Sequence, residues 1–337
     1  MMDVAGETRV EAGALTTLVA AIFGRAGMDE GDATLLAGSL VEADLGGVHS
    51  HGVLRVPEYV GKLTHGGVNP RGRPRVARDM GACLVVDGGN SMGQIGAHFA
   101  MALAIERATT TGIAAVAVRG NNHCGALAPY VRQATARDMI GWATTNALPT
   151  MAPWGGAERL LGINPLGVGI PAGEEAPIIY DAAFSSAAHG KLRVYQQKGL
   201  TLPEGWALDR EGHSTLDPAA AIDGLLMPIG GPLGGFKGTG LALIMGLLSS
   251  MLSGAAYGTE LGDMDSGPRA GEDGQFMLAL RVGAFEEIAR FKARVDGAIR
   301  QIHACRLAPG IARIYTPGEQ EWLTRQERER EGIPSTT

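Results

Sequence analysis

The stretch Ile113-Ala-Ala-Val-Ala-Val-Arg-Gly-Asn-Asn-His-Cys-Gly-Ala-Leu127 indicates the class of fold to which this chain belongs. Residues 113–118 form a continuous apolar, β-prone run, which is typical of a strand buried on both faces. The polar, glycine-containing segment after it leads into an expected helix that ends near Arg137. A strand, a turn and a helix in succession are typical of an α/β fold, in which ligands gather at the carboxyl ends of strands.

The sequence on both sides continues this alternation. Residues 82–87 and 140–145 predict further strands, and residues 96–110 predict a helix between them. Residues 178–181, 276–282 and 314–318 are expected to be extended, whereas residues 69–78, the Pro- and Gly-rich segment 149–173, the segment 203–218 and the segment 258–274 are expected to be connectors or loops. Helical periodicity predicts helices near both ends of the chain and in its middle. They are expected over residues 10–23, from Asp29 onward, and over residues 55–62, 192–198, 241–252, 285–305 and 319–332.

Composition limits the class of protein. The chain has 337 residues, 45% hydrophobic and 19% charged, which is ordinary for a soluble globular enzyme. The net charge of −6 provides no basic surface for nucleic acid. The three cysteines are scattered, and residues 1–9 contain no export signal, so we expect a reducing, cytoplasmic location. The apolar run 241–252 is expected to be too short to span a membrane.

A short polar stretch contains the first candidate site. His49, Ser50, His51 and Arg55 lie within one short segment. Imidazole exchanges protons near neutral pH, and guanidinium binds carboxylates through parallel hydrogen bonds, so the pattern suits a small organic acid. Two alternatives remain open, namely a metal site, for which further ligands at zinc spacing are not visible, and a plain polar turn. The one Gly-x-Ser-x-Gly match in the sequence, Gly89-Asn-Ser-Met-Gly93, does not include Ser50, so this serine has no nucleophile elbow that would support acyl transfer.

Two other segments are candidates for ligand binding. His123 lies where a strand is expected to give way to a helix, whose first N–H groups would suit a phosphate or carboxylate, although Asn and His also favour simple capping turns. Lys237 lies in the glycine-rich segment 234–240, where it is either a ligand or a solvated charge. That segment is not a phosphate-binding loop, and no Gly-x-Gly-x-x-Gly follows an amino-terminal strand, so a Rossmann fold is not supported.

Taken together in order, several motifs resemble the malate/L-lactate dehydrogenase family that lacks a Rossmann fold. The resemblance covers about residues 10–332. The motifs that carry it are Ala43-Asp44, His49-Ser-His-Gly-Val-Leu-Arg55, Tyr59, Val86-Asp-Gly88, Asn122-His-Cys-Gly-Ala-Leu127, Ala152-Pro-Trp-Gly-Gly156, Gly162-Ile-Asn-Pro165, residues 181–191, Pro203-Glu-Gly-Trp206-Ala-Leu-Asp209, Gly235-Phe-Lys-Gly238 and Pro317-Gly-Glu319.

The resemblance implies an architecture. It implies an α/β class with a mixed-sheet, non-Rossmann nicotinamide-binding domain over residues 76–284. A helical second domain on the substrate side would be formed by residues 1–75 and 285–337. It also implies NAD or NADP as cofactor, a small carboxylate substrate and a homodimer with the site near the subunit contact, with no metal, nucleic acid or membrane partner.

The resemblance also implies roles for individual residues. Ser50 and His51 match a serine–histidine relay, Arg55 matches the substrate-side arginine, and His123 matches the proton acceptor of the ureidoglycolate branch. Either histidine could be the proton group, and we expect His123. The segments that match cofactor contacts are Gly125, Ala126, Leu127, Asp181, Ala182, Ala183, Lys237, Thr316, Pro317 and Gly318.

The expected activity is hydride transfer between a nicotinamide and a small 2-hydroxy or 2-oxo acid of the malate, lactate, ureidoglycolate or sulfolactate type. A cyclic-imine (piperideine/pyrroline-2-carboxylate) reductase is the alternative within the family. It is disfavoured because that branch resembles Gly-Asp where this chain has Gly190-Lys191. A histidine-based metal hydrolase and a catalytically silent ligand-binding relative are the alternatives from other classes.

Overall fold

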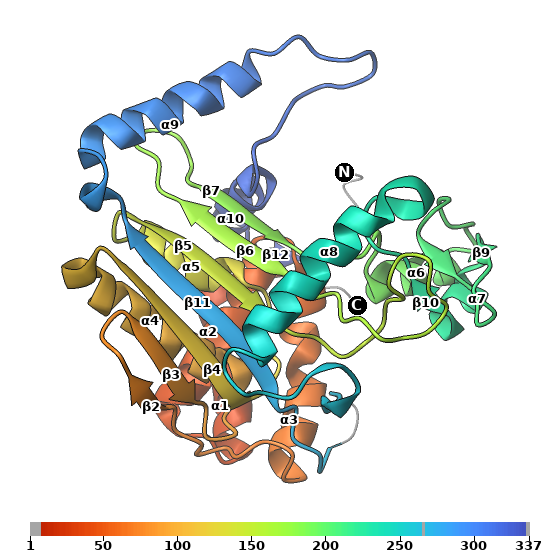
Figure 1. Cartoon of the computed structure of the whole chain (residues 1–337), viewed down its shortest axis with the longest axis horizontal. Helices are drawn as coiled ribbons and strands as arrows, with labels where there is room; N and C mark the ends of the chain where they lie inside the picture. The colour runs from red at the N-terminus through yellow and green to blue at the C-terminus, as the bar shows by residue number, and fades with distance from the viewer. Residues whose placement is uncertain (1–7, 265–266, 335–337) are drawn as a thin grey trace.

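The computed structural model describes residues 8–264 and 267–334. The segment on which the expected lack of an export signal depends therefore lies largely outside the described residues. The fold is built around one mixed sheet with helices on both faces (Figure 1).

The central sheet has seven strands in the order β2-β3-β4-β11-β5-β6-β7. Only the neighbours β3 and β4 run parallel, and every other pair in this sheet is antiparallel. The mixed, non-Rossmann α/β prediction is therefore confirmed. The strands are β2 (Arg75–Asp79), β3 (Cys83–Asp87), β4 (Ile113–Asn121), β5 (Met139–Thr145), β6 (Leu166–Ile170), β7 (Ile178–Ala182) and β11 (Asp273–Arg281).

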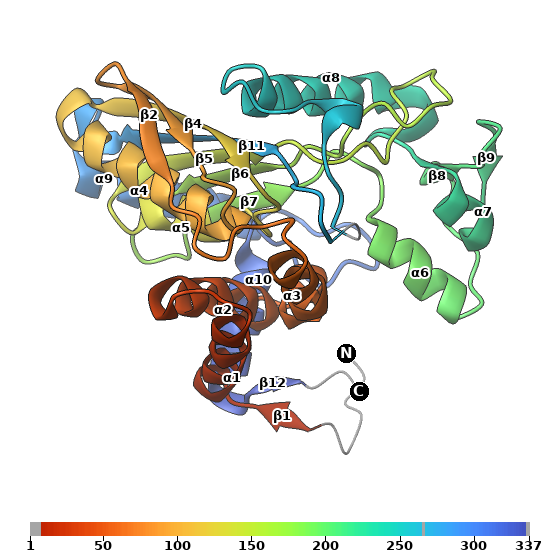
Figure 2. The same cartoon turned by 90° about the horizontal axis from the view of Figure 1, so that it is seen from below.

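Helices bury the sheet from both sides (Figure 2). α4 (Gly93–Thr111) and α5 (Ala128–Thr135) pack on one face against β4, β11, β5 and β6, and α8 (Gly231–Ser250) packs on the other face. Val116 and Val118 of β4 are fully buried beneath them, as expected of an apolar strand in the middle of a sheet. This burial fixes where β4 ends, and hence where the segment that contains His123 begins.

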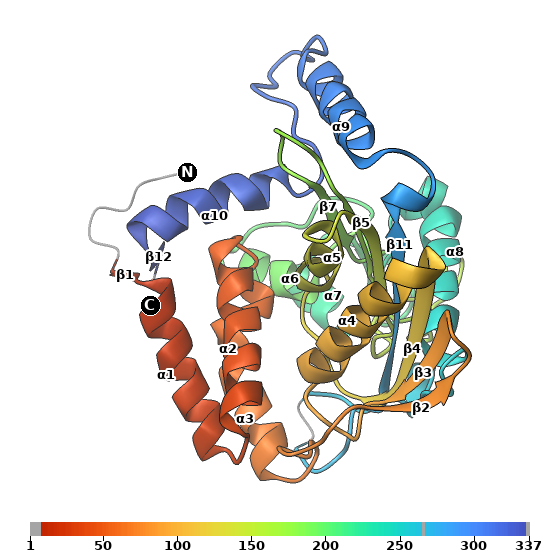
Figure 3. The same cartoon turned by 90° about the vertical axis from the view of Figure 1, so that its left-hand side faces the viewer.

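A separate helical layer lies beside α4 and α5 (Figure 3). It contains α1 (Ala12–Arg25), α2 (Glu30–Leu45) and α3 (Val56–Thr64) from one end of the chain, and α10 (Glu319–Glu331) from the other. Its core includes Phe23, Leu36, Leu40 and Tyr59. The ends of the chain also meet in a short sheet of β1 (Arg9–Val10) and β12 (Ile333–Pro334).

The helix α9 (Ile288–His303) stands apart from this layer. Asp296 accepts hydrogen bonds from the backbone of residues 173–175, and Lys292 pairs with Asp138, so α9 is held by the segments around the sheet. The predicted division of the chain groups α9 with the terminal helices. Its contacts connect it to both parts, because His303 Nε2 at the end of α9 also lies 2.8 Å from Glu319 Oε2 at the start of α10, and the division of the chain stays a prediction.

A small lobe extends from the far end of the sheet. It is made of α6 (His189–Gln197), α7 (Pro218–Asp223) and the short strands β8 (Ala207–Leu208), β9 (Ser214–Thr215) and β10 (Leu225–Leu226). Leu192, Leu202 and Ala221 form its core together with residues of α8.

Several predicted elements were wrong. β2 and β6 were expected to be connector and loop, and β8 and β9 lie in the segment 203–218 that was expected to be a surface excursion. Residues 314–316 form no strand. α8 begins at Gly231, well before the predicted start at Leu241, because the glycines of this segment are helical.

The full extent of α8 changes the expectation about membranes. This helix of 20 residues, with mean hydropathy 1.2, is long and apolar enough to cross a membrane by length and composition. The predicted apolar run 241–252 was judged too short to span a membrane because the start of the helix was misplaced. One face of α8 packs on β11, β5 and β4, and a helix that covers a core passes the same test.

Candidate active site

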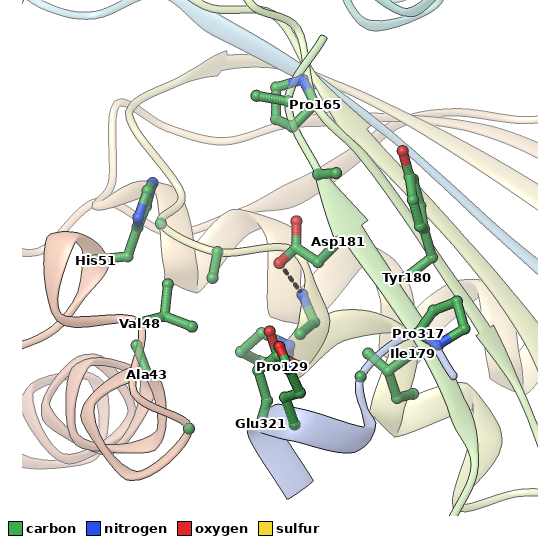
Figure 4. A pocket seen from close by; sticks show the side chains of 18 of the residues that line it. Ala43, Val48, His51, Pro129, Pro165, Ile179, Tyr180, Asp181, Pro317 and Glu321 are labelled. Carbon is green, nitrogen blue, oxygen red and sulfur yellow. Dashed lines mark hydrogen bonds between the residues drawn. The ribbon is translucent and has the colours of Figure 1, made fainter. Parts of the chain in front are cut away.

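A cavity of about 600 Å³ lies between the helical layer and the sheet. Figure 4 shows His51 and Val48 on one side of it and Asp181 and Tyr180 of β7 on the other. Of the predicted site residues, those that line it are Ser50, His51, Gly125, Ala126, Asp181, Ala182, Ala183, Thr316, Pro317 and Gly318.

The turn that carries Ser50, His51 and Arg55 is fixed by one buried carboxylate. Asp44, at the end of α2, is 2% exposed; it accepts the Val53 N–H at 2.8 Å and bonds His49 Nδ1 at 2.7 Å. A Cβ on Gly52 would lie 2.1 Å from Asp44 Oδ1, so only glycine permits this approach. The turn therefore consists of two short 3-10 helices, His49–His51 and Val53–Arg55, wrapped around Asp44.

The helix α10 closes this turn from outside. Arg328 donates to the backbone oxygen of Asp44 at 2.5 Å and to His49 Nε2 at 3.0 Å. Because arginine only donates, Nε2 of His49 accepts, and its Nδ1–H donates to Asp44. His49 is therefore occupied by structural bonds, which leaves His51 to face the cavity.

Within the turn, Ser50 and His51 form a pair. Ser50 Oγ lies 2.9 Å from His51 Nδ1. The Arg55 Nε–H donates to the Ser50 backbone oxygen at 2.8 Å, and its Nη1–H donates to Glu58 at 2.6 Å. These bonds fix the plane of the guanidinium and use only part of its five N–H donors.

His123 approaches from the sheet side. The His51 and His123 rings are stacked, with centroids 5.9 Å apart and planes 20° apart. His123 Nδ1 lies 2.8 Å from the Tyr59 hydroxyl. The two histidines predicted from separate segments thus meet, although they come from opposite layers of the molecule.

Burial determines the charge state of both rings. Burial, followed by the nearby His51 and Arg55, lowers the pKa of His123 to about 3. Burial, followed by the Arg55 charge, lowers the pKa of His51 to about 4. Both imidazoles are therefore neutral near pH 7 and can exchange a proton with a bound group.

The segment that carries His123 is held by buried amides. Asn121 donates to Gly93 O at 3.1 Å and to Gln275 Oε1 at 2.8 Å. Asn122 donates to Ser91 O at 2.7 Å and accepts the Gly271 N–H at 2.8 Å. These asparagines lie inside the molecule, and the alternative of a simple capping turn does not describe them.

The opposite wall is organised by two carboxylates. Asp181 of β7 accepts the N–H groups of Leu127 at 2.7 Å and Ala128 at 2.8 Å (Figure 4). The expected anion site at the start of α5 is thus filled by a carboxylate of the chain itself. Glu319 accepts the Thr316 N–H at 2.9 Å and shapes the turn that places Pro317 and Gly318 against Ile179.

Two predicted cofactor residues lie elsewhere. Leu127 is fully buried in the core and does not line the cavity, whereas its neighbours Gly125, Ala126 and Ala128 do. Lys237 is exposed on α8, with its ammonium 5.8 Å from the Phe236 ring, and does not line the cavity of its own chain.

Several charged and polar groups of the site had no role in the sequence-based prediction. Glu42, Arg132 and Glu321 line the cavity, and Arg132 pairs with Glu42 at 2.7 Å. Tyr59 lies one helical turn after Arg55, a spacing that places both on one side of the chain and could have indicated its role. Within the described residues, no group of three or more His, Cys, Asp or Glu is arranged to hold a metal ion.

Comparison with known proteins agrees with this architecture. The sequence profile of the malate/L-lactate dehydrogenase family matches residues 10–337. Malate dehydrogenase of Pyrococcus horikoshii is 37% identical over 330 residues, covering 97% of this chain and 91% of that protein. L-sulfolactate dehydrogenase of Methanocaldococcus jannaschii is 36% identical over 311 residues, covering 92% and 88%.

The fold of the relatives agrees as well. The solved structure of the Pyrococcus horikoshii malate dehydrogenase superposes with a TM-score of 0.91 at 34% identity, covering 99% of this chain and 93% of that one. Other similar proteins are an Escherichia coli ureidoglycolate dehydrogenase (NAD(+)), 31% identical over 92% of this chain and 87% of its own length, and a Pseudomonas putida Δ1-pyrroline-2-carboxylate/Δ1-piperideine-2-carboxylate reductase, 32% identical over 96% and 92%. The chain belongs to the malate/L-lactate dehydrogenase family and is an oxidoreductase.

Proposed function

We propose that the chain transfers a hydride between a nicotinamide cofactor and a small 2-hydroxy or 2-oxo carboxylic acid. The observation that carries this proposal is the convergence of Arg55, the Ser50–His51 pair and His123: Ser50 and His51 line the cavity, the His123 ring stacks on His51, and Arg55 donates to the Ser50 backbone. Arg55 would bind the carboxylate, and a neutral histidine would take the hydroxyl proton or return it.

The cavity fits a dinucleotide by its shape and its lining. Its volume is in the range of small-molecule sites, and Val48, Ile163 and Ile179 provide apolar walls for flat rings. The residues that would hold the cofactor are Gly125, Ala126, Asp181, Ala182, Ala183, Thr316, Pro317 and Gly318. The nicotinamide, when bound, supplies the hydride chemistry, and the chain supplies orientation and the proton.

We propose NAD as the preferred cofactor. Glu42, Asp181 and Glu321 line the cavity, whereas its one arginine, Arg132, is already paired with Glu42. Carboxylates accept hydrogen bonds from ribose hydroxyls and repel a 2′-phosphate. We expect kcat/KM with NAD to exceed that with NADP, and Glu321→Gln to narrow the difference.

Cyclic-imine reduction is a second candidate, favoured by the relative of that name. The sequence argument against it weakens in the structure. Lys191 lies on α6 with its ammonium 5.9 Å from the Trp206 ring, and it does not line the cavity. The presence of Lys191, where the imine-reductase branch resembles Asp, therefore leaves the charge of this cavity unchanged.

We also propose a homodimer that uses the outer face of α8. Leu233 is 92% exposed, Phe236 53%, Ile244 52% and Met251 58%, and their spacing forms one stripe. Such a stripe marks an interface, and Lys237 lies beside it. Sedimentation should show a dimer that Ile244→Glu dissociates. Monomers that bind lipid vesicles would instead mean that this face meets a membrane.

The test of the activity is a screen at the nicotinamide absorbance. Both cofactors would be combined with malate, lactate, sulfolactate, ureidoglycolate and their oxo forms, and with Δ1-piperideine-2-carboxylate, with and without a chelator. We expect turnover of an open-chain acid that the chelator leaves unchanged. Turnover of the imine alone would select the second candidate, and activity lost with the chelator would contradict both.

A further inference from the structure

A buried chain of polar groups lies behind His123. Tyr59 of α3 and Gln94, in the first turn of α4, are both fully buried. Gln94 Nε2 lies 3.1 Å from the Tyr59 hydroxyl, which lies 2.8 Å from His123 Nδ1. Within the described part of the chain, Gln94 Oε1 has no hydrogen-bond partner. A carboxamide buried this deeply, beside the site and half satisfied, calls for an explanation.

The direction of each bond follows from the donors. Burial raises the pKa of Tyr59, so its hydroxyl keeps its single proton. Since Gln94 Nε2–H donates to the Tyr59 oxygen, the Tyr59 proton is directed to His123 Nδ1. The Gly125 N–H, 3.4 Å away, points to the same nitrogen. Nδ1 is then an acceptor, and neutral His123 carries its proton on Nε2.

Rotation of the Gln94 carboxamide by about 180° reverses the chain. Oε1 then accepts the Tyr59 proton, the Tyr59 oxygen accepts from His123 Nδ1–H, and Nε2 of His123 becomes a bare acceptor. The described orientation leaves Oε1 without a hydrogen-bond partner among the described residues, so no bond to that atom opposes the rotation. Only the weak Gly125 contact favours the Nε2–H form.

We propose that Gln94 is a positioning residue that acts through Tyr59 to set which nitrogen of His123 carries the proton. The Nε2–H tautomer donates a hydrogen bond to the oxygen of a bound 2-oxo acid. The Nδ1–H tautomer, whose Nε2 carries no proton, accepts the hydrogen bond from the hydroxyl of a 2-hydroxy acid. This role rests on the proposed function, because it assigns the two forms to the two ends of one reaction.

The proton balance of the oxidation is complete in the reversed orientation. The O–H bond breaks and its proton passes to His123 Nε2, the C–H electron pair leaves as hydride to the nicotinamide, and a carbonyl forms. His123 becomes an imidazolium whose Nδ1–H stays bound to Tyr59, and it loses a proton before the next turnover. Reduction starts from the imidazolium, so the neutral ring first gains a proton; the Nε2 proton then passes to the carbonyl oxygen as the hydride reaches the carbon, which leaves the Nδ1–H form.

The experiment measures ¹⁵N shifts of the histidine rings in the free protein, which distinguish Nδ1–H from Nε2–H without any substrate. We expect His123 to be the Nε2–H form in the wild type. Gln94→Glu, whose ionised carboxylate only accepts, should convert it to Nδ1–H, and Tyr59→Phe should give a mixture. The control is Gln133→Glu, because Gln133 contacts His98 Nδ1 at 3.1 Å on the surface.

Kinetics provide the second readout. Gln94→Met should lower kcat about 10-fold and shift its pH profile, with KM changed less. Unchanged ¹⁵N chemical shifts of the His123 ring in folded Tyr59→Phe and Gln94→Met would overturn the proposal. This holds even if Gln94→Glu does not fold. Altered shifts in a protein that turns over no acid would support the positioning role and contradict the proposed function alone.

Discussion

The two segments that bring histidines to the cavity are held by different kinds of interaction. The turn of Ser50, His51 and Arg55 is held by bonds to two charged groups, namely the Asp44 carboxylate, which bonds His49 and the Val53 N–H, and Arg328 of α10. The segment of His123 is held by the neutral amides of Asn121 and Asn122, whose bonds reach β11 and the start of α4.

The difference indicates that the two segments respond differently to salt. Buried neutral amides with satisfied bonds hold a single arrangement that does not depend on pH or salt. The bonds that the half-buried Arg328 donates to the turn involve its charge and respond more to salt. The structure thus fixes the candidate proton group rigidly, and it places the candidate carboxylate clamp on a more adjustable turn.

Removal of the group on the amide-held segment should have the largest effect. His123→Ala should lower kcat by about 10²–10⁴-fold, because a positioned acid or base contributes that much, with a smaller change in KM. Steady-state rates in both directions measure it. The control is His98→Ala on the exposed side of α4, and wild-type kinetics for His123→Ala would remove His123 from the chemistry.

Removal of the clamp should affect binding instead. Arg55→Ala should raise KM for the acid about 10- to 100-fold, which corresponds to a lost hydrogen bond to a charged group. Arg55→Lys should recover part of the loss, because lysine keeps the charge and loses the paired geometry. Arg75→Ala, on an exposed edge strand, is the control. If Arg55→Ala changed kcat alone, the division between clamp and proton group would be wrong.

The sequence predicted the parts of this site that lie next to clear elements. His123 follows a strand whose apolar run is unambiguous, so its position just after the carboxyl end of that strand was predicted correctly. β6 was missed because Leu166-Gly-Val-Gly-Ile170 has the composition of a loop. A Cβ at Gly169 would lie 2.8 Å from Val131 O, so its glycines serve the contact with α5. β2 was missed because all five of its residues are exposed.

Other parts of the site depend on contacts that no local pattern contains. Gln94 and Tyr59 are 35 positions apart, and Tyr59 and His123 are 64 apart, so their chain exists only after the layers pack. The motif that contains Lys237 was assigned to the cofactor by resemblance, yet it lies on the outer face of α8. The role of Lys237 stays a prediction.

Weakening the bonds of Asp44 that hold the turn should raise KM for the acid less than removal of the Arg55 side chain does. Asp44→Asn keeps a polar group but weakens the bonds to His49 and Val53, so we expect KM to rise about 10-fold while the His123 ring shifts stay unchanged. Asp32→Asn, in the first turn of the same helix, is the control. A kcat effect without a KM effect would mean that the turn and the His123 segment act as one unit.

The smallest expected effect separates the two histidines by pH. Both have a lowered pKa when folded, about 4 for His51 and about 3 for His123, so between these values and about 6.5 the unfolded chain binds more protons. Stability should therefore be full above pH 6.5 and fall as the pH drops, by at most about 1.4 kcal/mol per pH unit for each ring. Denaturant unfolding at steps from pH 7 to pH 3 measures the fall and where it levels off. His51→Gln and His123→Gln should each reduce it, and the His51 share should level off first because its folded pKa is higher. Equal unfolding free energies at all of these pH values in the wild type would show that neither ring is as dehydrated as the structure indicates.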